Sequence, residues 1–387
     1  MKIERDASGM PRTITLRTPF DTHVHLRQDK SMRLIAPMHA QRFSGMIIMP
    51  NIDPPITTCD RLDQYRVEAT RAILDGRYVA SRLSDRVPLC LMTFYLTDQL
   101  NPAQIDIAVP GNAVGVKYYP RGLTTGSDNG VENPSSLWTR GTTPYEVLRI
   151  LANNKGTLFL HAANGLDRDG DELDPYGQEI DFIRETLPRI RDAHPGVRIS
   201  VEHLSTAPGA EYLRTHGSAL LGCSITAHHL LFDRRDVFRK GLRPNLHCWP
   251  VIQSREHQSE LRSLVAEDRS YVYLGTDSAP HPRHKKECDC VAGGIFTGHA
   301  GIELYAEAFE DMHALEALED FASHHGPAFF GISDLLEPAG NITLVRESWE
   351  VPDFYHLCDN PMSPNGLHWE CIRPLRAGQR IRWKLAA

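Results

Sequence analysis

The fold of this chain is indicated first by the stretch Thr22-His23-Val24-His25-Leu26-Arg27, which follows an extended run at residues 13–20. Residues two apart in a strand point to the same face, so both imidazoles can converge on one point. Imidazole is a preferred ligand of zinc and related metals. Arg27 follows on the same face, where it could bind an anion. In a chain with 19 histidines, a chance pair is the alternative to a metal site.

Short apolar segments rich in β-branched residues alternate with stretches of helical character along the chain. Strands are predicted at residues 14–25, 45–50, 88–95, 113–118, 157–161, 198–203, 219–226 and 271–276. Helices are predicted at residues 59–74, 143–153, 178–193, 207–213 and 255–267. Eight βαβ units predict an α/β fold with a (β/α)8 TIM-type barrel. An open doubly wound sheet is the alternative, but no Gly-x-Gly-x-x-Gly follows the first strand, which disfavours a dinucleotide site.

The C-terminal part of the chain has a different character from the barrel region. A helical stretch at residues 300–324 is followed by about fifty Pro-rich residues with short extended pieces at 341–345 and 380–385. We therefore expect one barrel domain over residues 1–387. Residues 338–387 would form a small β-containing C-terminal extension packed on the barrel.

The composition limits the class of protein and its partners. The chain has 387 residues, of which 41% are hydrophobic and 24% charged, as in soluble globular proteins. Its net charge of −7 disfavours nucleic acid and anionic membranes as partners. A polar N-terminus without an apolar segment predicts no secretory signal, and no apolar run is long enough to span a membrane. We expect a cytoplasmic protein.

The eight cysteines are scattered, and none has Cys-x-x-Cys spacing. In a chain of this size, such cysteines are typical of reduced thiols. Cys288-x-Cys290 is the one close pair. We interpret it as a loop with two free thiols rather than a metal or redox site.

Ionisable side chains stand at the C-terminal ends of five predicted strands, which are otherwise apolar. They are His23, His25, Lys117, His161, His203 and Asp277. A barrel gathers these strand ends at its active-site mouth. Each residue alone could be a hydrogen-bonded strand end, but together they predict a metal site.

The number of potential ligands bears on the number of metals. Four histidines and an aspartate exceed the three protein ligands that usually hold one catalytic zinc. A second metal would need an anionic bridge, which a lysine ammonium cannot provide. Lys117 could bridge only if its amine were neutral and captured carbon dioxide as a carbamate. A cationic lysine that binds substrate is the alternative, and these residues alone leave both open.

The same residues lie in motifs that resemble the dihydroorotase family, within the amidohydrolase superfamily, in its short bacterial stand-alone type. The motifs are Asp21-Thr22-His23-Val24-His25-Leu26-Arg27, Met49-Pro50-Asn51, Val116-Lys117-Tyr118-Tyr119-Pro120, Leu160-His161, Val201-Glu202-His203-Leu204-Ser205-Thr206, Gly275-Thr276-Asp277-Ser278-Ala279-Pro280-His281 and Ala377-Gly378-Gln379-Arg380-Ile381-Arg382-Trp383. They run over almost the whole chain. The Gly275 motif, together with Arg27 and Asn51, is the most specific part of the resemblance.

The resemblance implies a site with two Zn²⁺ ions. One ion would be bound by His23, His25 and Asp277, the other by His161 and His203, and Lys117, carboxylated by carbon dioxide, would bridge them. The substrate carboxylate would contact Arg27, Asn51 and His281, and the substrate would also meet the backbone of Trp249 and Gly293. Thr124 and Thr125 would lie on a mobile loop that closes over the substrate.

Three features depart from the family pattern or invite a second interpretation. Trp249 stands where the family has a leucine, and its indole could reshape the pocket wall. The acidic segment 162–177 is longer than expected and is interpreted as a surface insertion. The basic run 281–286 is interpreted, apart from His281, as a solvated loop.

The resemblance also implies a reaction and an assembly. The family interconverts N-carbamoyl-L-aspartate and L-dihydroorotate with loss or gain of water, in the third step of pyrimidine biosynthesis. In ring opening, a metal-activated water would attack the amide carbonyl, and Asp277 would carry the proton to the departing nitrogen. We expect a homodimer with a small-molecule substrate and no nucleic-acid partner.

Two other functions are weighed against this one. A related cyclic amidase of the hydantoinase, dihydropyrimidinase or allantoinase type would act on substrates without a ring carboxylate, which Arg27, Asn51 and His281 disfavour. An inactive dihydroorotase-like partner of a transcarbamoylase would have lost metal ligands, yet all the expected ligands are present. A substrate panel tests the first alternative, and metal analysis tests the second.

Overall fold

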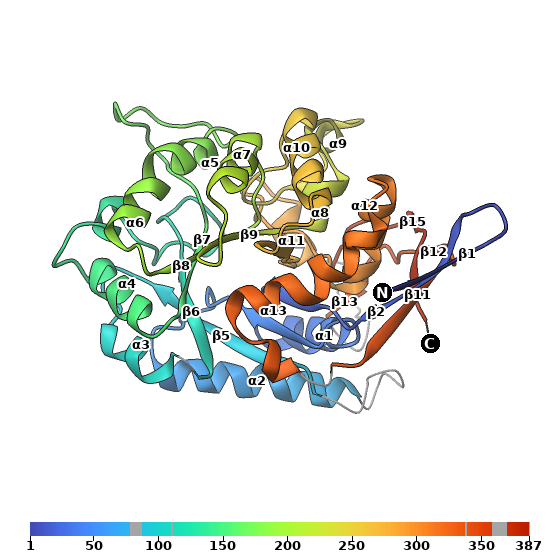
Figure 1. The fold of residues 1–387 in the computed structure, drawn as a ribbon, viewed down its shortest axis with the longest axis horizontal. Helices are drawn as coiled ribbons and strands as arrows, with labels where there is room; N and C mark the ends of the chain where they lie inside the picture. Colours follow the sequence, from blue (N-terminus) through green and yellow to red (C-terminus); the bar gives the residue numbers. More distant parts are fainter. Residues whose placement is uncertain (78–86, 110, 337–338, 358–369, 387) are drawn as a thin grey trace.

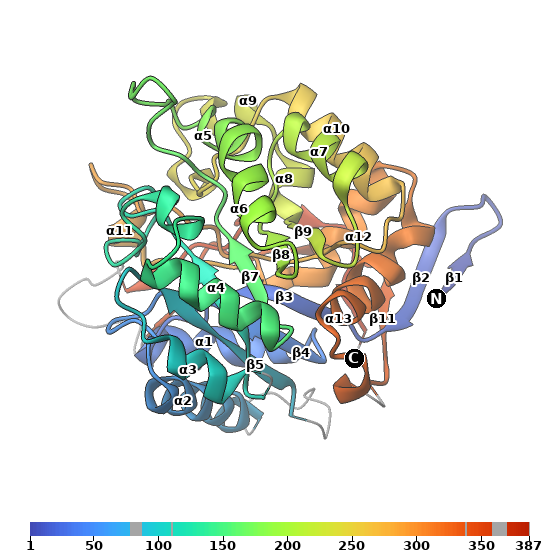
Figure 2. The same ribbon diagram turned by 60° about the vertical axis from the view of Figure 1, so that its left-hand side comes forward.

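Eight parallel strands form the centre of the molecule, and helices surround them (Figures 1 and 2). The computed structural model describes residues 1–77, 87–109, 111–336, 339–357 and 370–386. In spatial order the barrel strands are β3 (Phe20–Val24), β4 (Gly45–Ile48), β5 (Leu89–Leu96), β6 (Ala113–Tyr118), β7 (Thr157–Leu160), β8 (Arg198–Val201), β9 (Leu221–Ile225) and β10 (Val272–Leu274). All eight overlap predicted strands, so the predicted (β/α)8 architecture is confirmed.

The barrel closes where β3 lies beside β10 and the residues that follow it. The side chain of Thr22 donates a hydrogen bond to the carbonyl of Leu274 at 2.7 Å. Beyond the end of β10, the Asp277 amide donates to His23 O at 2.9 Å. The His25 amide donates to Ser278 O at 3.1 Å. The seam therefore brings two of the predicted metal-binding segments together.

Helices follow or connect the barrel strands. They are α1 (Asp29–Ala40), α2 (Cys59–Arg77), α3 (Pro102–Ala108), α4 (Thr143–Asn153), α5 (Gln178–Asp181), α6 (Leu187–Ala193), α7 (Ala207–His216), α8 (Ala227–Leu231), α9 (Arg234–Phe238), α10 (Arg255–Ala266), α11 (Arg283–Lys286), α12 (Gly301–Asp311) and α13 (His325–Phe330). Helix α4 matches its predicted bounds, because Thr142 caps its first turn, Pro144 suits that turn, and its apolar face is buried. The predicted helix 178–193 contains a π-helical segment, Phe182–Thr186, between α5 and α6. The predicted helix 300–324 is interrupted after α12.

The first predicted strand, at residues 14–25, was wrong in its extent. The chain forms two strands there, β2 (Pro11–Arg17) and β3, which belong to different sheets. Pro19 lies between them and has no amide hydrogen with which to continue a ladder. Its carbonyl instead accepts a hydrogen bond from the amide of Ser44 at 2.7 Å.

The two ends of the chain share one antiparallel sheet, beside the barrel (Figure 1). Its order is β1 (Lys2–Arg5), β2, β11 (Asn341–Val345) and β16 (Lys384–Leu385). Two small strand pairs complete the C-terminal part, β12 (Trp349–Glu350) with β15 (Arg380–Ile381) and β13 (Tyr355–His356) with β14 (Cys371–Ile372). The expected extension at 338–387 thus includes β-structure, although residues 338, 358–369 and 387 lie outside the described part. The participation of β1 and β2 in this sheet was not predicted.

Helix α13 covers the amino-terminal end of the barrel. Phe330 stacks on Phe159 of β7 with ring centroids 5.3 Å apart, and Phe329 lies 5.1 Å from the ring of Tyr273. Phe20 and Ile47 belong to the same buried cluster. Because this end is filled by apolar side chains, access to the barrel axis is left to the carboxyl ends of the strands.

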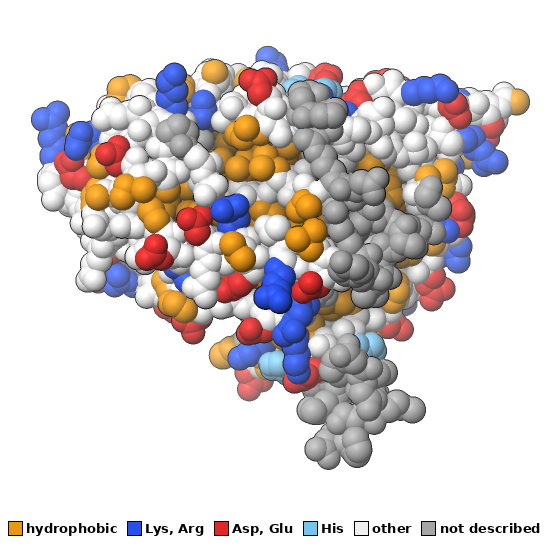
Figure 3. Space-filling view, turned by 90° about the horizontal axis from the view of Figure 1, so that it is seen from below, with side chains coloured by type: hydrophobic (Ala, Val, Ile, Leu, Met, Phe, Trp, Pro, Cys, Tyr) orange, Lys and Arg blue, Asp and Glu red, His pale blue; other side chains and the backbone are white. Residues whose placement is uncertain are grey.

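Among the described residues, no helix combines the length and the apolar character that a membrane span requires. Figure 3 shows one face of the molecule, where basic and acidic side chains are interspersed with small hydrophobic groups. The described side chains on this face therefore form no continuous surface of one charge.

We predict that Gly115→Ala destabilises the barrel. Gly115 of β6 pairs with Thr157 of β7, and a Cβ atom at this position would lie 1.8 Å from the carbonyl oxygen of Thr157. The backbone of one strand would have to shift, at a cost of about 1–3 kcal/mol of unfolding free energy. Urea denaturation measures the loss. Gly196→Ala, whose Cβ would meet nothing closer than 3.9 Å, is the control and should change stability by less than about 0.5 kcal/mol. Equal stability of the two variants would contradict the prediction.

Candidate active site

Most of the site residues predicted from the sequence line one cavity at the carboxyl ends of the barrel strands. The lining residues are His23, His25, Arg27, Asn51, Tyr119, Thr124, Thr125, His161, His203, Trp249, Asp277, Ala279, Gly293 and Gly294. Tyr119, Ala279 and Gly294 were not predicted to take part. Lys117 and His281 were predicted but lie behind the lining, as described below.

Three predicted ligands bring their donor atoms together at one point. Nε2 of His23 lies 3.3 Å from Nε2 of His25. Oδ1 of Asp277 lies 3.5 Å from the first nitrogen and 3.1 Å from the second. Ligands of a tetrahedral zinc ion, each at 2.0–2.1 Å, are separated by about 3.3 Å. The three atoms are therefore spaced as one face of a zinc coordination tetrahedron.

The outer nitrogens of these two histidines are held by hydrogen-bond partners. Nδ1 of His23 pairs with the carboxylate of Glu202, and Nδ1 of His25 lies 2.8 Å from Oδ1 of Asn51. Such contacts leave Nε2 free to bind a metal and fix the orientation of the ring. Asn51, predicted as a substrate contact, thus also orients a ligand.

A second pair of histidines lies beside the first. Nδ1 of His161 is 3.2 Å from Nε2 of His203, and Nδ1 of His203 has no hydrogen-bond partner among the described residues. Burial lowers the pKa of His161 to about 3 and that of His25 to about 4, and it brings the pKa of His203 well below its usual value. All three imidazoles are therefore neutral at pH 7, which is the form that binds metals.

Lys117 is fully buried at the end of β6, and its Nζ has no hydrogen-bond partner among the described residues. Burial lowers the pKa of Lys117 to about 8, although Glu202 and Asp277 act in the opposite direction. A buried ammonium without a partner is unfavourable. The neutral amine that carbamate formation requires is therefore accessible near neutral pH.

Glu202 is the functional residue that the sequence reasoning missed. Its fully buried carboxylate accepts hydrogen bonds from His23 and from the hydroxyl of Ser224, the latter at 3.0 Å. The same Ser224 oxygen accepts a hydrogen bond from the backbone amide of His203 at 2.8 Å. One carboxylate thus connects a ligand from each predicted metal. The available signal was an acidic residue at the end of an apolar strand.

Three site residues adopt left-handed backbone conformations. The φ angles are 42° at His203, 41° at Asp277 and 61° at Arg27. Such angles are uncommon for residues with a side chain and cluster at functional sites.

The expectation that Arg27 lies on the same strand face as His23 and His25 was wrong, because the strand that carries His23 ends at Val24. Arg27 reaches the cavity through this turn and not as part of a continuous strand face.

The guanidinium of Arg27 is held without a carboxylate partner among the described residues. Nε donates to the carbonyl of Pro280 at 2.9 Å, and Nη2 lies 2.9 Å from Nε2 of His281. Burial keeps the pKa of His281 well below its usual value, so the neutral ring can accept this bond. His281 therefore lies against Arg27, one layer behind the cavity. Arg27 remains available to an anionic ligand.

The loop that carries Thr124 and Thr125 is docked over the cavity. Oγ1 of Thr125 accepts a hydrogen bond from the Gly293 amide at 2.9 Å, and the hydroxyl of Tyr95 donates to Gly126 O at 3.0 Å. The enclosed volume of about 20 Å³ is room for about one water molecule. This volume is too small for a ring-sized ligand, so the lining must move to admit one, and the loop is the segment that lies over the cavity.

Trp249 packs directly on Gly293 across the cavity. A Cβ atom on Gly293 would lie 2.2 Å from Cδ1 of the indole, so this position requires a glycine. The tryptophan found in place of the family's leucine is accommodated in this way.

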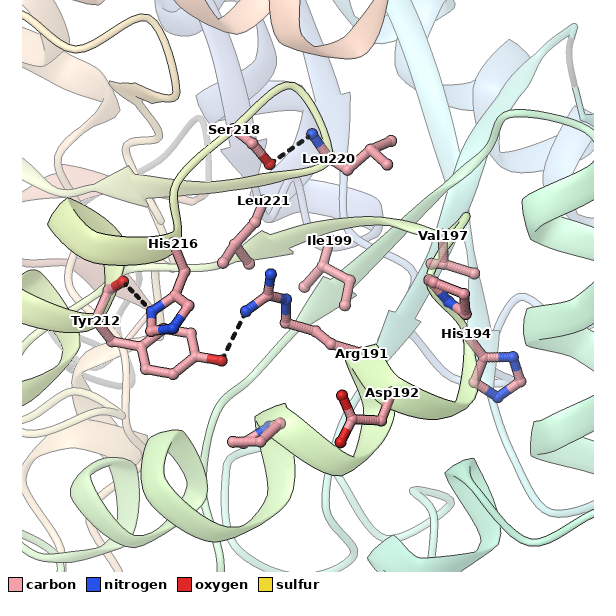
Figure 4. Close-up of a pocket in the computed structure, with 12 residues that line it drawn as sticks. Arg191, Asp192, His194, Val197, Ile199, Tyr212, His216, Ser218, Leu220 and Leu221 are labelled. Atoms are coloured by element: carbon pink, nitrogen blue, oxygen red, sulfur yellow. Dashed lines mark hydrogen bonds between the residues drawn. The ribbon is translucent and has the colours of Figure 1, made fainter.

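A larger pocket of about 480 Å³ lies elsewhere, between α6 and α7 (Figure 4). Within it, Nη1 of Arg191 donates to the hydroxyl of Tyr212 at 2.9 Å. Ile199 and Leu221, near the beginnings of β8 and β9, form its floor. Because it lies toward the amino-terminal ends of the strands, it is separate from the predicted site.

Curated relatives identify the family. A dihydroorotase of Acidovorax sp. (strain JS42) is 36% identical over 375 residues, which cover 97% of this chain and 98% of the relative. A dihydroorotase of Halorhodospira halophila (strain DSM 244 / SL1) is 38% identical over 374 residues, which cover 96% and 99%. This chain belongs to the dihydroorotase family. A comparison with protein-family models gave no match.

Solved structures of the dihydroorotase family share the fold. The enzyme of Saccharomyces cerevisiae, crystallised in complex with 5-fluoroorotic acid, superimposes with a TM-score of 0.81 at 27% identity and covers 97% of this chain and 98% of its own. An L-hydantoinase of Arthrobacter aurescens, at 17% identity and a TM-score of 0.72, covers 96% and 83% and shows the fold alone. The dihydroorotase family comprises metal-dependent hydrolases that act on a cyclic amide, and the chain is assigned to this enzyme class.

We predict that Glu202→Gln weakens metal binding. Oε2 of Glu202 accepts the hydrogen bonds from His23 and Ser224, and Oε1 accepts one from the hydroxyl of Ser200. A neutral amide is a weaker acceptor and must turn its NH2 group toward one of these donors, so the ligands lose their fixed orientation. Loss of such a contact lowers metal affinity by roughly 10–100-fold. Metal content after dialysis against graded chelator concentrations measures this. Glu211→Gln, an exposed substitution on α7, is the control. Unchanged metal retention in Glu202→Gln would contradict the assigned role.

Proposed function

We propose that this chain is a dihydroorotase that interconverts N-carbamoyl-L-aspartate and L-dihydroorotate at a site for two Zn²⁺ ions. The observation that carries the proposal is the combination, in one cavity, of a converging ligand set and a guanidinium with no carboxylate partner among the described residues. The first suits a metal, and the second suits a substrate carboxylate.

His23, His25 and Asp277 would hold one ion, and His161 and His203 the other. The amine of Lys117, which has no hydrogen-bond partner among the described residues, would be carboxylated by carbon dioxide and supply the anionic bridge between them. When bound, the ions lower the pKa of a water nucleophile and stabilise the charge that develops on the amide oxygen.

Asp277 would carry the proton. Burial alone would raise the pKa of this carboxyl, but the hydrogen bond from His25 and the neighbouring histidines lower the pKa below its usual range. The group is therefore ionised at neutral pH and can accept a proton during ring opening. It would then deliver that proton to the departing amide nitrogen, and biosynthesis would reverse these steps.

Arg27 and Asn51 would bind the substrate carboxylate, with His281 holding the guanidinium in place or contacting the substrate itself. The backbone of Trp249 and Gly293 would contact the ring. Opening of the 124–126 segment would admit the substrate, and its return would exclude water from the site. The homodimer implied by the family resemblance remains a prediction. The cytoplasmic location and the absence of nucleic-acid partners, expected from composition and charge, also remain predictions.

The function is tested by turnover of L-dihydroorotate on protein whose metal content has been counted. Wild-type protein should hydrolyse dihydroorotate in preference to hydantoin, which lacks the ring carboxylate. Arg27→Gln should lower kcat/KM for dihydroorotate by about 10–100-fold, since a hydrogen-bonded ion pair is lost. Arg149→Gln, on the outer surface of α4, is the matched control and should keep the wild-type kcat/KM. Asp277→Asn should have almost no turnover and serves as the inactive reference. Preference for hydantoin would favour the cyclic amidase alternative, and metal-free, inactive protein would favour the structural partner.

The bridging role of Lys117 is tested by Lys117→Ala. This variant should lose activity and at least part of its metal, and short carboxylic acids such as acetate should restore some activity by occupying the place of the carbamate. Lys286→Ala is the matched control, because Nζ of this buried lysine donates to three backbone carbonyls, each at 2.9 Å. Carboxylic acids cannot replace a donor, so they should not rescue it. Full activity of Lys117→Ala would exclude a carbamate bridge.

A further inference from the structure

A second group of potential metal ligands lies outside the residues assigned to the catalytic ions. It consists of His228 and His229, at the beginning of α8, and Cys248, which precedes Trp249. Each offers one ligand atom, and these atoms lie within 4.8 Å of one another. All three side chains are buried. We refer to these residues as the His-His-Cys cluster.

His228 is the most informative member of the cluster. Its side chain is fully buried, yet neither ring nitrogen has a hydrogen-bond partner among the described residues. Buried polar groups in folded proteins are nearly always paired, and each exception requires an explanation such as an ion or a water. A ligand atom for a metal is one use of such a nitrogen.

The other two members face a common oxygen atom. Nε2 of His229 lies 3.3 Å from the carbonyl oxygen of Pro250, and Sγ of Cys248 lies 3.2 Å from the same oxygen. Nδ1 of His229 is 2.8 Å from Oγ1 of Thr226. Without a metal, the thiol of Cys248 donates to the Pro250 carbonyl, and Nε2–H of His229 can do so as well. In the other tautomer, Nδ1 of His229 donates to Thr226 and the lone pair of Nε2 is free for a cation. A cation among these atoms would satisfy all of them.

We propose that the His-His-Cys cluster is a further metal site, specific for a borderline or soft ion such as Zn²⁺. Two imidazoles and a thiolate are a donor set that zinc prefers, and the Pro250 carbonyl provides an oxygen beside it. Thr226 would fix the ring of His229 through its other nitrogen. Binding would release the proton of the Cys248 thiol to solvent.

The site would be reached independently of the catalytic cavity. Cys248 lines a separate cavity of about 320 Å³, together with Tyr176, Phe238 and Leu242. Its neighbour Trp249 lines the catalytic cavity instead. An ion held by Cys248 and by α8 would thus fix the wall of the active site from behind.

Cobalt spectroscopy distinguishes the two sites. The catalytic ligands are nitrogen and oxygen atoms, so a thiolate-to-cobalt charge-transfer band can arise only from a cysteine. The test uses protein with Cys288→Ser and Cys290→Ser, because both of these thiols are exposed. After metal removal and reconstitution with Co²⁺, this protein should show the band. The addition of Cys248→Ser should abolish it and lower the metal content by one ion per chain. Cys90→Ser, at a buried cysteine in β5, is the matched control and should retain both.

A second variant distinguishes loss of the metal site from a folding defect in Cys248→Ser. His228→Gln retains hydrogen-bonding groups for a buried water but removes the imidazole, so it should weaken Co²⁺ binding at this site while circular dichroism remains that of the parent. Absence of the band in the parent, or equal metal content with and without Cys248, would overturn the proposal and leave only a buried water at His228. Both readouts are independent of turnover, so they separate this site from the proposed catalytic function.

Discussion

The buried carboxylate of Asp21 is the interaction on which the active site depends. It accepts hydrogen bonds from the backbone amides of His23 at 3.0 Å and Thr276 at 2.9 Å. The hydroxyl of Thr276 and Nε2 of His39, on α1, lie 2.6 Å from its other oxygen. This single group joins the first barrel strand, the segment after the last one, and the helix between β3 and β4. His23 and Asp277, adjacent to these contacts, therefore meet at a fixed distance.

Burial determines the protonation state of the nitrogen ligands in the site. The imidazoles of His25, His161 and His203 are kept neutral because their charged forms would be poorly solvated. The same effect brings the Lys117 amine toward neutrality. A set of neutral nitrogens and ionised carboxylates attracts cations, so the apolar barrel that surrounds the site also prepares its chemistry.

The barrel was predicted well because eight apolar segments alternate with helical stretches. Five of these segments also end in ionisable residues that packing alone does not explain. The role of Glu202 was missed because its position at the end of an apolar strand does not show which groups its carboxylate contacts. Only the folded chain places His23 and Ser224 against it. The pairing of β2 with β11 joins residues more than three hundred positions apart and leaves no local signal. His281 is similar, because only the folded chain shows it lying behind Arg27. Contacts of this kind depend on tertiary packing, which residue patterns do not encode locally.

The sheet shared by the two ends of the chain has a consequence for biosynthesis. Strand β2 leaves the ribosome before the barrel strands, whereas its partner β11 follows only after the entire barrel has been made. Until then, one edge of the β1–β2 hairpin has unpaired backbone groups, and such an edge can associate with other chains. A chain truncated before Asn341 would retain that edge permanently. Pairing of β2 with β11 therefore removes a surface through which unfinished chains would aggregate.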